Sequence, residues 1–352
     1  MRSTPANRVL FVSHTAELGD AELSLLDVAI GHRERGAVAL FSDGPLAAAL
    51  VSHNVAVIPI SAGMTGPSSL RAAYALSRAA VPFGLLYANS PASFLVSAAA
   101  GLFADRRVVW HLRDILDTEH FNVFHIRLLI ALANRRAGRV VANAQSVADA
   151  FVAAGGRREL TRVVYDGIDV QPFDRLGPQA RADVRRTIGI SDHDFVVGVV
   201  AERGDEAAQR LVRNSIEMLP GAHALVIDRA RRETPRLIAA CDVVVHVSSA
   251  SDVSARALVE PLIGRRPVVA GAIGVAREIV ESGETGILVP PGDANALTET
   301  LRRLRDDPVR RDEIAFAGHA DARRRFSRQS MNASITRVLD DVLSGASAIP
   351  LP

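Results

Sequence analysis

The strongest chemical pattern of the sequence lies between Ser248 and Pro267. An apolar run ends there in small polar residues, and two carboxylates, Asp252 and Glu260, follow in a segment with a helical pattern. Eight residues of helix leave the two acids about 80° apart over two turns, so they can share one side of a ligand. Carboxylates accept hydrogen bonds from sugar and ribose hydroxyls. A solvated helix face is the alternative for Asp252, and Pro261 is expected to kink or end the helix.

A second candidate follows an apolar strand pattern, in the segment from Trp110 to Asp114. Side chains at this point of the chain leave the edge of a sheet. His111 can donate or accept a proton near neutral pH, and Arg113 can meet a phosphate or a carboxylate. The alternative is a structural histidine that Asp114 or Asp117 holds in place. The residues alone leave both interpretations open.

Polar loops follow other expected strands as well. Gly19 and Asp20 stand between the first apolar run and a helix pattern, where free backbone N–H groups and the helix dipole form an anion site. The alternative is a plain turn in which Asp20 caps the helix. Asn89 offers a short polar side chain after another strand, although turn and cap chemistry accounts for it adequately.

The composition restricts the chemistry further. All 41 basic residues are arginine, since the sequence contains no lysine. A Schiff-base lysine, a lysine general base and a phosphate loop that ends in Gly-Lys are therefore excluded. Any phosphate must be held by arginine, by backbone N–H groups or by helix N-termini. The formal net charge of +2 gives no reason to expect a nucleic-acid partner.

Two features bear on the compartment. The single cysteine, Cys241, cannot form an internal disulfide, which fits a reducing compartment. The short apolar run that begins at Val9 predicts no export signal. The longest uncharged stretch, between Arg78 and Asp105, contains prolines and glycine, so we interpret it as a strand, a loop and a helix rather than as a membrane span.

Alternating strands and helices must position the candidate residues. Short apolar runs alternate with helical patterns along the whole chain, which is typical of βαβ units and of mostly parallel sheets whose strands are buried on both faces. The expected strands are Val9–Ser13, Ala37–Phe41, Val55–Ile58, Leu85–Ala88, Val108–Trp110, Val140–Ala142, Arg162–Val164, Phe195–Ala201, Ala222–Ile227, Val243–Val247, Pro267–Ala270 and Gly286–Val289.

Two domains are the natural division of 352 residues. The stretch from Gly167 to Ser191 is punctuated by proline and glycine, which suits a connection between domains. We predict an N-terminal Rossmann-like domain at 1–168, a C-terminal one at 169–326, and a helix with a fraying tail at 327–352. Open parallel sheets bind ligands beyond the carboxyl ends of their strands, so two such α/β domains facing a cleft would enclose the candidate residues.

Taken in order, these segments resemble the group 1 glycosyltransferases of family 4, which have the GT-B fold and retain the anomeric configuration. The resemblance covers most of the chain, from the Gly19-Asp20 loop to Ser327. It is most specific between Asp252 and Asp293, in the two-acid segment, the Gly-x-Pro-Val-Val-like strand and the Glu-Ile-Val…Gly-x-Thr-Gly turn.

The resemblance implies a role for each candidate. Glu260 would contact the donor ribose, and Asp252 stands where a glutamate touches the transferred sugar or its leaving phosphate. His111 matches the histidine that lines the sugar site, so His111 and Asp252 are the expected catalytic residues. Such enzymes use a nucleotide diphosphate sugar as co-substrate and need no metal. The other expected residues are those of the donor-binding loops, Gly19, Asp20 and Arg203, and those of the acceptor side, Asn89 and Arg113.

The sequence also departs from the family pattern. Asp20 replaces a second glycine where the phosphates should approach, Asp252 is one methylene shorter than glutamate, and Asp166 replaces an asparagine. An Arg–Lys pair of the family is reduced to Arg203. After Asp228 the chain passes almost immediately to the next helix, so the C-terminal domain is expected to lack one helix–strand unit.

Our leading hypothesis is a glycosyltransferase that moves a sugar from a nucleotide diphosphate sugar to a hydroxyl acceptor with retention, in the synthesis of a cell-envelope glycan, glycolipid or polysaccharide. The competing hypothesis is a non-catalytic protein of this fold that binds a nucleotide or a partner, and a third is a sugar-nucleotide epimerase. The segment from Phe124 to Arg136 reads as a basic amphipathic helix, suited to anionic headgroups and a lipid-linked acceptor. We expect a cytoplasmic protein, either free or peripheral on the inner face of the membrane.

Overall fold

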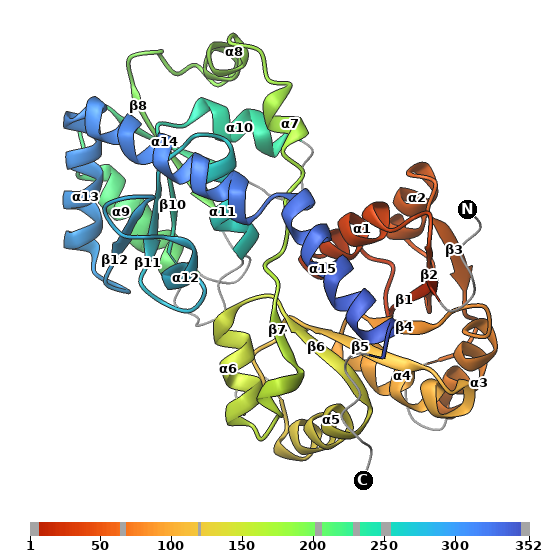
Figure 1. Cartoon of the computed structure of the whole chain (residues 1–352). Helices are drawn as coiled ribbons and strands as arrows, with labels where there is room; N and C mark the ends of the chain where they lie inside the picture. The colour runs from red at the N-terminus through yellow and green to blue at the C-terminus, as the bar shows by residue number, and fades with distance from the viewer. Residues whose placement is uncertain are drawn as a thin grey trace. The chain divides into compact units, whose positions relative to one another are not determined.

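The computed structural model describes residues 7–63, 68–118, 121–200, 206–227, 233–247 and 255–345. The chain forms two compact units, each built on one parallel sheet. Unit 1 comprises the chain up to Gly167 and again from Arg328, and unit 2 comprises Ile168–Ser327 (Figure 1). The last helix, which the sequence analysis keeps as a separate segment, belongs to unit 1. Both α/β units have the parallel sheets that the strand pattern predicts.

The sheet of unit 1 has seven strands in the order β3-β2-β1-β4-β5-β6-β7, all parallel. The apolar runs predict every strand to within a few residues. Their bounds are β1 Val9–Ser13, β2 Gly36–Leu40, β3 Ala56–Pro59, β4 Leu85–Ala88, β5 Arg107–Leu112, β6 Ala137–Ala142 and β7 Thr161–Val163.

Helices cover both faces of this sheet. Trp110 on one face stacks on Phe94 of α4 and meets Phe151 of α6, whereas the opposite face packs against α1, α2 and α15. The uncharged stretch before Asp105 is β4 followed by α4, as predicted. The helices of unit 1 are α1 Asp20–Gly31, α2 Pro45–Ser52, α3 Ser68–Ala79, α4 Pro91–Ala104, α5 Val123–Arg136, α6 Gln145–Ala153 and α15 Arg328–Leu343, with a 3-10 turn at Arg158–Leu160.

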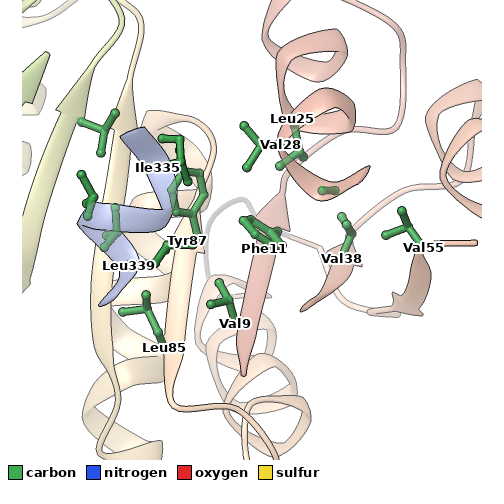
Figure 2. Close-up of a cluster of buried hydrophobic side chains, with 14 of the residues drawn as sticks. Val9, Phe11, Leu25, Val28, Val38, Val55, Leu85, Tyr87, Ile335 and Leu339 are labelled. Atoms are coloured by element: carbon green, nitrogen blue, oxygen red, sulfur yellow. The ribbon is translucent and has the colours of Figure 1, made fainter. Parts of the chain in front are cut away.

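The core of unit 1 depends on the last helix of the chain. Ile335 and Leu339 of α15 are fully buried against the same sheet face as Phe11 and Tyr87 (Figure 2). The rings of Phe11 and Tyr87 meet edge to face with 5.2 Å between their centroids. An apolar face of a parallel sheet must be covered, and here a segment more than 300 residues from β1 covers it.

Unit 2 has a parallel sheet of five strands in the order β12-β11-β10-β8-β9. The strands are β8 Phe195–Val200, β9 Ala222–Ile227, β10 Val243–His246, β11 Val268–Gly271 and β12 Ile287–Val289. The helices are α7 Gln171–Asp174, α8 Ala180–Thr187, α9 Glu206–Glu217, α10 Thr234–Ala240, α11 Ala255–Ile263, α12 Ala276–Ile279, α13 Ala294–Asp306 and α14 Pro308–Arg325.

The two units differ at one edge of their sheets, where the loss of a helix–strand unit stays a prediction. In unit 1, β2 is flanked by β3, whereas its counterpart β9 is the outermost strand among the described residues of unit 2. Val226 of β9 is consequently 62% exposed. The expectation that strands are buried on both faces is therefore wrong for edge strands such as β3 and β9, because helices and neighbours cover them on fewer sides.

Two further expectations can be compared with the structure. The helix that contains Pro261 does not end there but continues to Ile263, since Pro261, Leu262 and Ile263 are all buried and their packing holds the last turn. Among the described residues, no helix combines the length and the apolar character that crossing a membrane requires.

Candidate functional site

The carboxyl edge of the unit 1 sheet carries a connected cluster of buried polar side chains. Asn89 follows β4, His111 lies near the end of β5, and Arg113 comes directly after β5. Asn143 follows β6, and Asp166 lies beyond β7. Because parallel strands end at the same edge, the fold brings together residues that are far apart in the sequence.

Arg113 is the centre of this cluster. Its Nη1 donates to the side-chain oxygen of Asn89 at 2.6 Å, and its Nη2 donates to the hydroxyl of Ser24 at 2.9 Å. Its Nε lies 3.5 Å from a carboxylate oxygen of Asp166. The Arg113 side chain is 9% exposed. The sequence predicts that Arg113 can bind a phosphate or a carboxylate. In the structure, Asp166 of the same chain supplies the carboxylate.

Asp166 balances the buried guanidinium. Ser24 donates a hydrogen bond to one carboxylate oxygen, and Asn143 donates to the other at 3.2 Å. Burial alone would raise the pKa of Asp166, but the charge of Arg113 and the two hydrogen bonds outweigh it and hold the pKa below its ordinary value. Asp166 therefore stays ionised, and Arg113 and Asp166 form a compensated pair rather than an isolated buried charge.

His111 is completely buried beneath this pair. Its Nδ1 lies 2.6 Å from the hydroxyl of Tyr87 and 2.9 Å from Nη2 of Arg113. Burial, followed by the positive charge of Arg113, holds the pKa of His111 well below its ordinary value, although Asp166 acts in the opposite direction. Among the described residues, Nε2 of His111 has no hydrogen-bond partner. The ring is neutral at neutral pH, and its catalytic role stays a prediction.

The first loop of unit 1 differs in detail from its expected form. Gly19, not Asp20, is the N-cap residue of α1, and it makes no side-chain cap hydrogen bond. The alternative in which Asp20 caps the helix is therefore wrong. Asp20 is the first helical residue and is exposed, where its negative charge complements the helix dipole. Donor binding by Gly19 and Asp20 stays a prediction.

The loop after β4 combines cap and cluster chemistry. Ser90 caps α4 by accepting a hydrogen bond from the backbone N–H of Ser93, with Pro91 in the first turn, as turn and cap chemistry predicts. Asn89 instead joins the cluster: its amide donates to the backbone oxygen of Ala21 at 3.1 Å, and its oxygen accepts from Arg113. Asn89 is 1% exposed, so its contact with an acceptor stays a prediction.

Unit 2 contributes Glu260, which lies on α11 in the apolar surroundings that the sequence predicts. Its side chain is 13% exposed, and one oxygen lies 3.4 Å from a guanidinium nitrogen of Arg256, one turn earlier. The other two expected residues of this region, Asp252 and Arg203, lie outside the described residues. In the described ranges, no group of three or more His, Cys, Asp or Glu side chains could hold a metal ion.

Sequence reasoning did not find all members of the cluster. Tyr87 lies in the middle of an apolar strand pattern, and Ser24 lies in a helix pattern, so neither differs from ordinary core residues in sequence. Asp166 is the one member that the sequence could have indicated, because an acid at this position can balance the charge of Arg113. Nothing in the sequence, however, shows that the two residues are in contact.

Comparison with known proteins assigns both halves of the chain. The family profile of glycosyltransferase family 4 matches residues 21–172, and that of glycosyl transferases group 1 matches residues 190–321. The chain is also similar to Anabaena HepE, whose crystal structure in complex with UDP and glucose superposes with a TM-score of 0.85 at 30% sequence identity, covering 95% of this chain and 99% of HepE.

Further similarities are more distant or shorter. Sucrose-phosphate synthase of Thermosynechococcus elongatus shares the fold at 14% identity, with a TM-score of 0.75 over 96% of this chain and 100% of that chain. A GDP-mannose-dependent monoacylated alpha-(1-6)-phosphatidylinositol monomannoside mannosyltransferase of Corynebacterium glutamicum is 25% identical over 54% of this chain and 58% of that enzyme. A phosphatidyl-myo-inositol mannosyltransferase of Mycobacterium leprae is 36% identical over 26% of this chain and 24% of that enzyme.

The chain thus spans 58% of the corynebacterial enzyme and 24% of the Mycobacterium leprae enzyme, but 99% of HepE. The first profile ends at residue 172, close to the boundary between the units, and the second begins at residue 190 within unit 2, so the matches follow the order of the units. With its two parallel α/β sheets, its two matched profiles and its similarity to HepE, the chain belongs to the group 1, family 4 glycosyltransferases of the GT-B fold.

Proposed function

We propose that this protein transfers a sugar from a nucleotide diphosphate sugar to a hydroxyl acceptor with retention of configuration. The observation that carries the proposal is the similarity to HepE, which extends over almost the whole of both chains and whose structures contain UDP, UDP with glucose, or UDP-glucose. UDP is therefore the first donor nucleotide to test. GDP is the second, because the similar corynebacterial enzyme is GDP-mannose-dependent.

Each expected site residue has a place in this proposal. Glu260 of unit 2 accepts hydrogen bonds from the donor ribose, and Asp252 contacts the transferred sugar or its leaving phosphate. The N-terminus of α1 at Gly19 and Asp20, together with Arg203, supports the pyrophosphate. His111, Asn89 and Arg113 of unit 1 form the sugar and acceptor side.

The proposed reaction has one bond exchange. The bond between the anomeric carbon and the donor phosphate oxygen breaks, and the acceptor oxygen bonds to the same face of that carbon. The departing phosphate oxygen takes the acceptor proton, and the nucleoside diphosphate leaves. The negative charge on this leaving group would be stabilised by arginine, backbone N–H groups and the dipole of α1. The proposal includes no metal, so transfer should persist in a chelator such as EDTA.

Nucleotide binding is the first test. UDP, GDP, UDP-glucose and GDP-mannose should each be titrated calorimetrically into the full chain. The same nucleotides and nucleotide sugars should be screened for thermal stabilisation of the protein. We expect at least one nucleotide diphosphate sugar to bind and to be hydrolysed or transferred. If none binds, the proposal fails, and the non-catalytic interpretation of this shortened fold replaces it.

Site variants then test the residue assignments. Loss of hydrogen bonds to a charged carboxylate costs about 1.5–3 kcal/mol, so Glu260→Ala should weaken donor binding tenfold or more. Glu217→Ala, which removes an exposed carboxylate at the end of α9, is the matched control and should bind donor normally. His111→Ala should lower turnover. If both Glu260→Ala and His111→Ala leave transfer intact, the site assignment is wrong.

We further propose that the acceptor is lipid-linked and that α5 touches the cytoplasmic face of the membrane. Phe124 is 75% exposed and Val123 is 47% exposed in the first turn of α5, and the neighbouring side chain of Leu128 is 40% exposed. Arg127 and Arg135 are exposed on the same helix. Exposed aromatic and aliphatic side chains beside arginine suit an interface with anionic lipid headgroups.

Liposome flotation tests this membrane contact. The protein should float with vesicles that contain anionic phospholipid and should remain unbound with purely zwitterionic vesicles. Phe124→Ser should reduce the floated fraction several-fold. Phe316→Ser is the matched control, because Phe316 is a 64% exposed phenylalanine on α14 of unit 2. Equal flotation of the two variants, or no flotation of the wild-type protein, would contradict the proposal.

A further inference from the structure

The contact between Arg113 and His111 determines which ring nitrogen of His111 carries the hydrogen. An arginine side chain can only donate hydrogen bonds, because none of its nitrogens has a free lone pair to offer. Nη2 of Arg113 lies 2.9 Å from Nδ1 of His111. Nδ1 must therefore be an acceptor, which means that it carries no hydrogen.

Tyr87 follows from the same argument. Its hydroxyl lies 2.6 Å from the same Nδ1, so it too must donate, and the two donors share one lone pair as a three-centre bond. Burial raises the pKa of Tyr87 far above its ordinary value, so the hydroxyl keeps the hydrogen that it donates. The only ring nitrogen of His111 that can carry the hydrogen is then Nε2.

We propose that Arg113 is a positioning residue that fixes His111 as a neutral ring with its hydrogen on Nε2, so that His111 serves as a hydrogen-bond donor and never as a general base. The consequence rests on the proposed function: Nε2–H would donate to an oxygen of the bound sugar or phosphate. In the described part of the chain this buried N–H has no partner, and an unpaired buried donor is costly. A ligand oxygen would remove that cost.

The charged groups around the ring keep it in this state. Protonation of Nδ1 would place a second positive charge beside Arg113 and would leave two donors facing an N–H. Asp166 is the neighbouring anion, but Arg113, Ser24 and Asn143 already engage its carboxylate. Asn89 and Ser24 accept hydrogen bonds from Arg113 and hold its side chain beside His111, so the tautomer of His111 depends on Arg113.

Imidazole 15N NMR of the full chain tests the tautomer without any substrate. His111 can be assigned by comparison with His111→Gln. In the wild-type protein we expect Nδ1 to show the chemical shift of an unprotonated nitrogen and Nε2 that of an N–H, with no change between about pH 5 and 8. An Nδ1–H signal, or titration of the ring in this range, would overturn the proposal even if the enzyme transfers sugar normally.

Two variants separate Arg113 from Tyr87. Arg113→Met removes the neighbouring positive charge and leaves the Asp166 carboxylate facing the ring, so His111 should titrate at higher pH than in the wild-type protein and Nδ1 should be able to carry a hydrogen. Tyr87→Phe is the matched control: Arg113 still donates to Nδ1, so the hydrogen should stay on Nε2. If Arg113→Met retains the wild-type spectrum, Arg113 does not fix the tautomer. If Arg113→Met fails to fold, the wild-type and Tyr87→Phe spectra still decide the proposal.

The pH profile of transfer gives an independent measurement where activity is found. The wild-type profile should show no ionisation of His111, and Arg113→Met should acquire one. His111→Gln, whose amide can still donate, should retain more activity than His111→Ala. Absence of all activity would count against the proposed function, whereas the spectra of the free protein would still support or refute the tautomer.

Discussion

The two units share a winding order but complete their sheets by different means. Unit 1 extends to seven strands and covers one sheet face with α1, α2 and α15, which form one apolar cluster of 21 buried residues. In unit 2, with five described strands, the described core is divided into a cluster of 14 buried residues and a smaller one of seven beside α10. Arginine side chains hold this smaller region together instead.

A buried arginine of unit 2 donates hydrogen bonds to several backbone oxygens. Arg185 of α8 is completely buried and donates to the backbone oxygens of Ser191, Asp192, Asp194 and Ala240, and to the carboxylate of Asp242 at 2.7 Å. A carbonyl left unpaired in the interior is costly, and charge-assisted hydrogen bonds are strong. Where little apolar surface is available, a buried guanidinium can fasten several loops at once.

Of the variants that test this difference between the units, Arg185→Met should have the largest effect on stability. Asp242 and four backbone oxygens would lose the hydrogen bonds that Arg185 donates, although Arg181 and the backbone N–H of Val196 still donate to Asp242. Breaking a buried ion pair costs about 3–5 kcal/mol, so urea unfolding should show a loss of up to this order. Hydrogen exchange should rise in α8, β8 and β10 and not in unit 1. The control is Arg186→Met, which removes an arginine with a 75% exposed side chain and should change stability by about 0.5 kcal/mol or less. If Arg185→Met lowers the free energy of unfolding by less than about 1 kcal/mol, Arg185 does not hold the loops of unit 2 together.

Leu339→Ala tests the apolar core of unit 1. Leu339 of α15 is completely buried in the unit 1 core, and removal of such a side chain costs about 2–5 kcal/mol. Hydrogen exchange should rise in β1, β4 and β5 while unit 2 is unaffected, the reverse of Arg185→Met. Arg337→Ala on the exposed face of α15 should leave exchange unchanged. Exchange that rises equally in both units would show that they are not separate stability units.

Gly318→Ala should have a smaller effect, within unit 2. A Cβ at Gly318 of α14 would lie 2.4 Å from the backbone oxygen of Thr285, so the helix must shift, at a cost of about 1–3 kcal/mol. At Gly177 a Cβ would meet nothing within 4 Å, so Gly177→Ala should change stability by about 0.5 kcal/mol or less. Equal thermal unfolding of the two variants would rule out a tight α14 contact.

His32 should give the smallest effect, as a pH dependence of unit 1. Its ring joins α1 to α15, with Nδ1 2.8 Å from the backbone oxygen of Val28 and Nε2 3.0 Å from the hydroxyl of Thr336. Burial lowers the pKa of His32 below its ordinary value. The unfolded chain therefore binds the proton first, and stability should fall as the pH drops below about 6.5, by at most about 1.4 kcal/mol per unit.

His32→Gln removes this ionisation, so the slope of unfolding free energy against pH should become shallower below pH 6.5. His193→Gln, which changes an exposed histidine of unit 2, is the control and should keep the wild-type slope. A steeper slope for His32→Gln would mean that the sign of the linkage is wrong.

The sequence by itself determined the local elements and the family. Apolar runs of parallel strands are continuous because both faces are usually covered, so all twelve described strands could be predicted, with errors only in their ends and in the burial of edge strands. From the short passage after β9 we predict that one helix–strand unit is missing, because a crossover needs residues that the sequence lacks there.

The tertiary structure alone decided which polar residues meet. Ser24 and Asp166 reach Arg113, and Tyr87 reaches His111, from different elements of the fold. No pattern of period 2 or 3.6 records such contacts between distant segments. It also decided that α15 completes unit 1 and that His111 is buried rather than exposed at the edge. Burial and the direction of a hydrogen bond depend on neighbours in space, and these set the protonation of a side chain whose identity the sequence supplies.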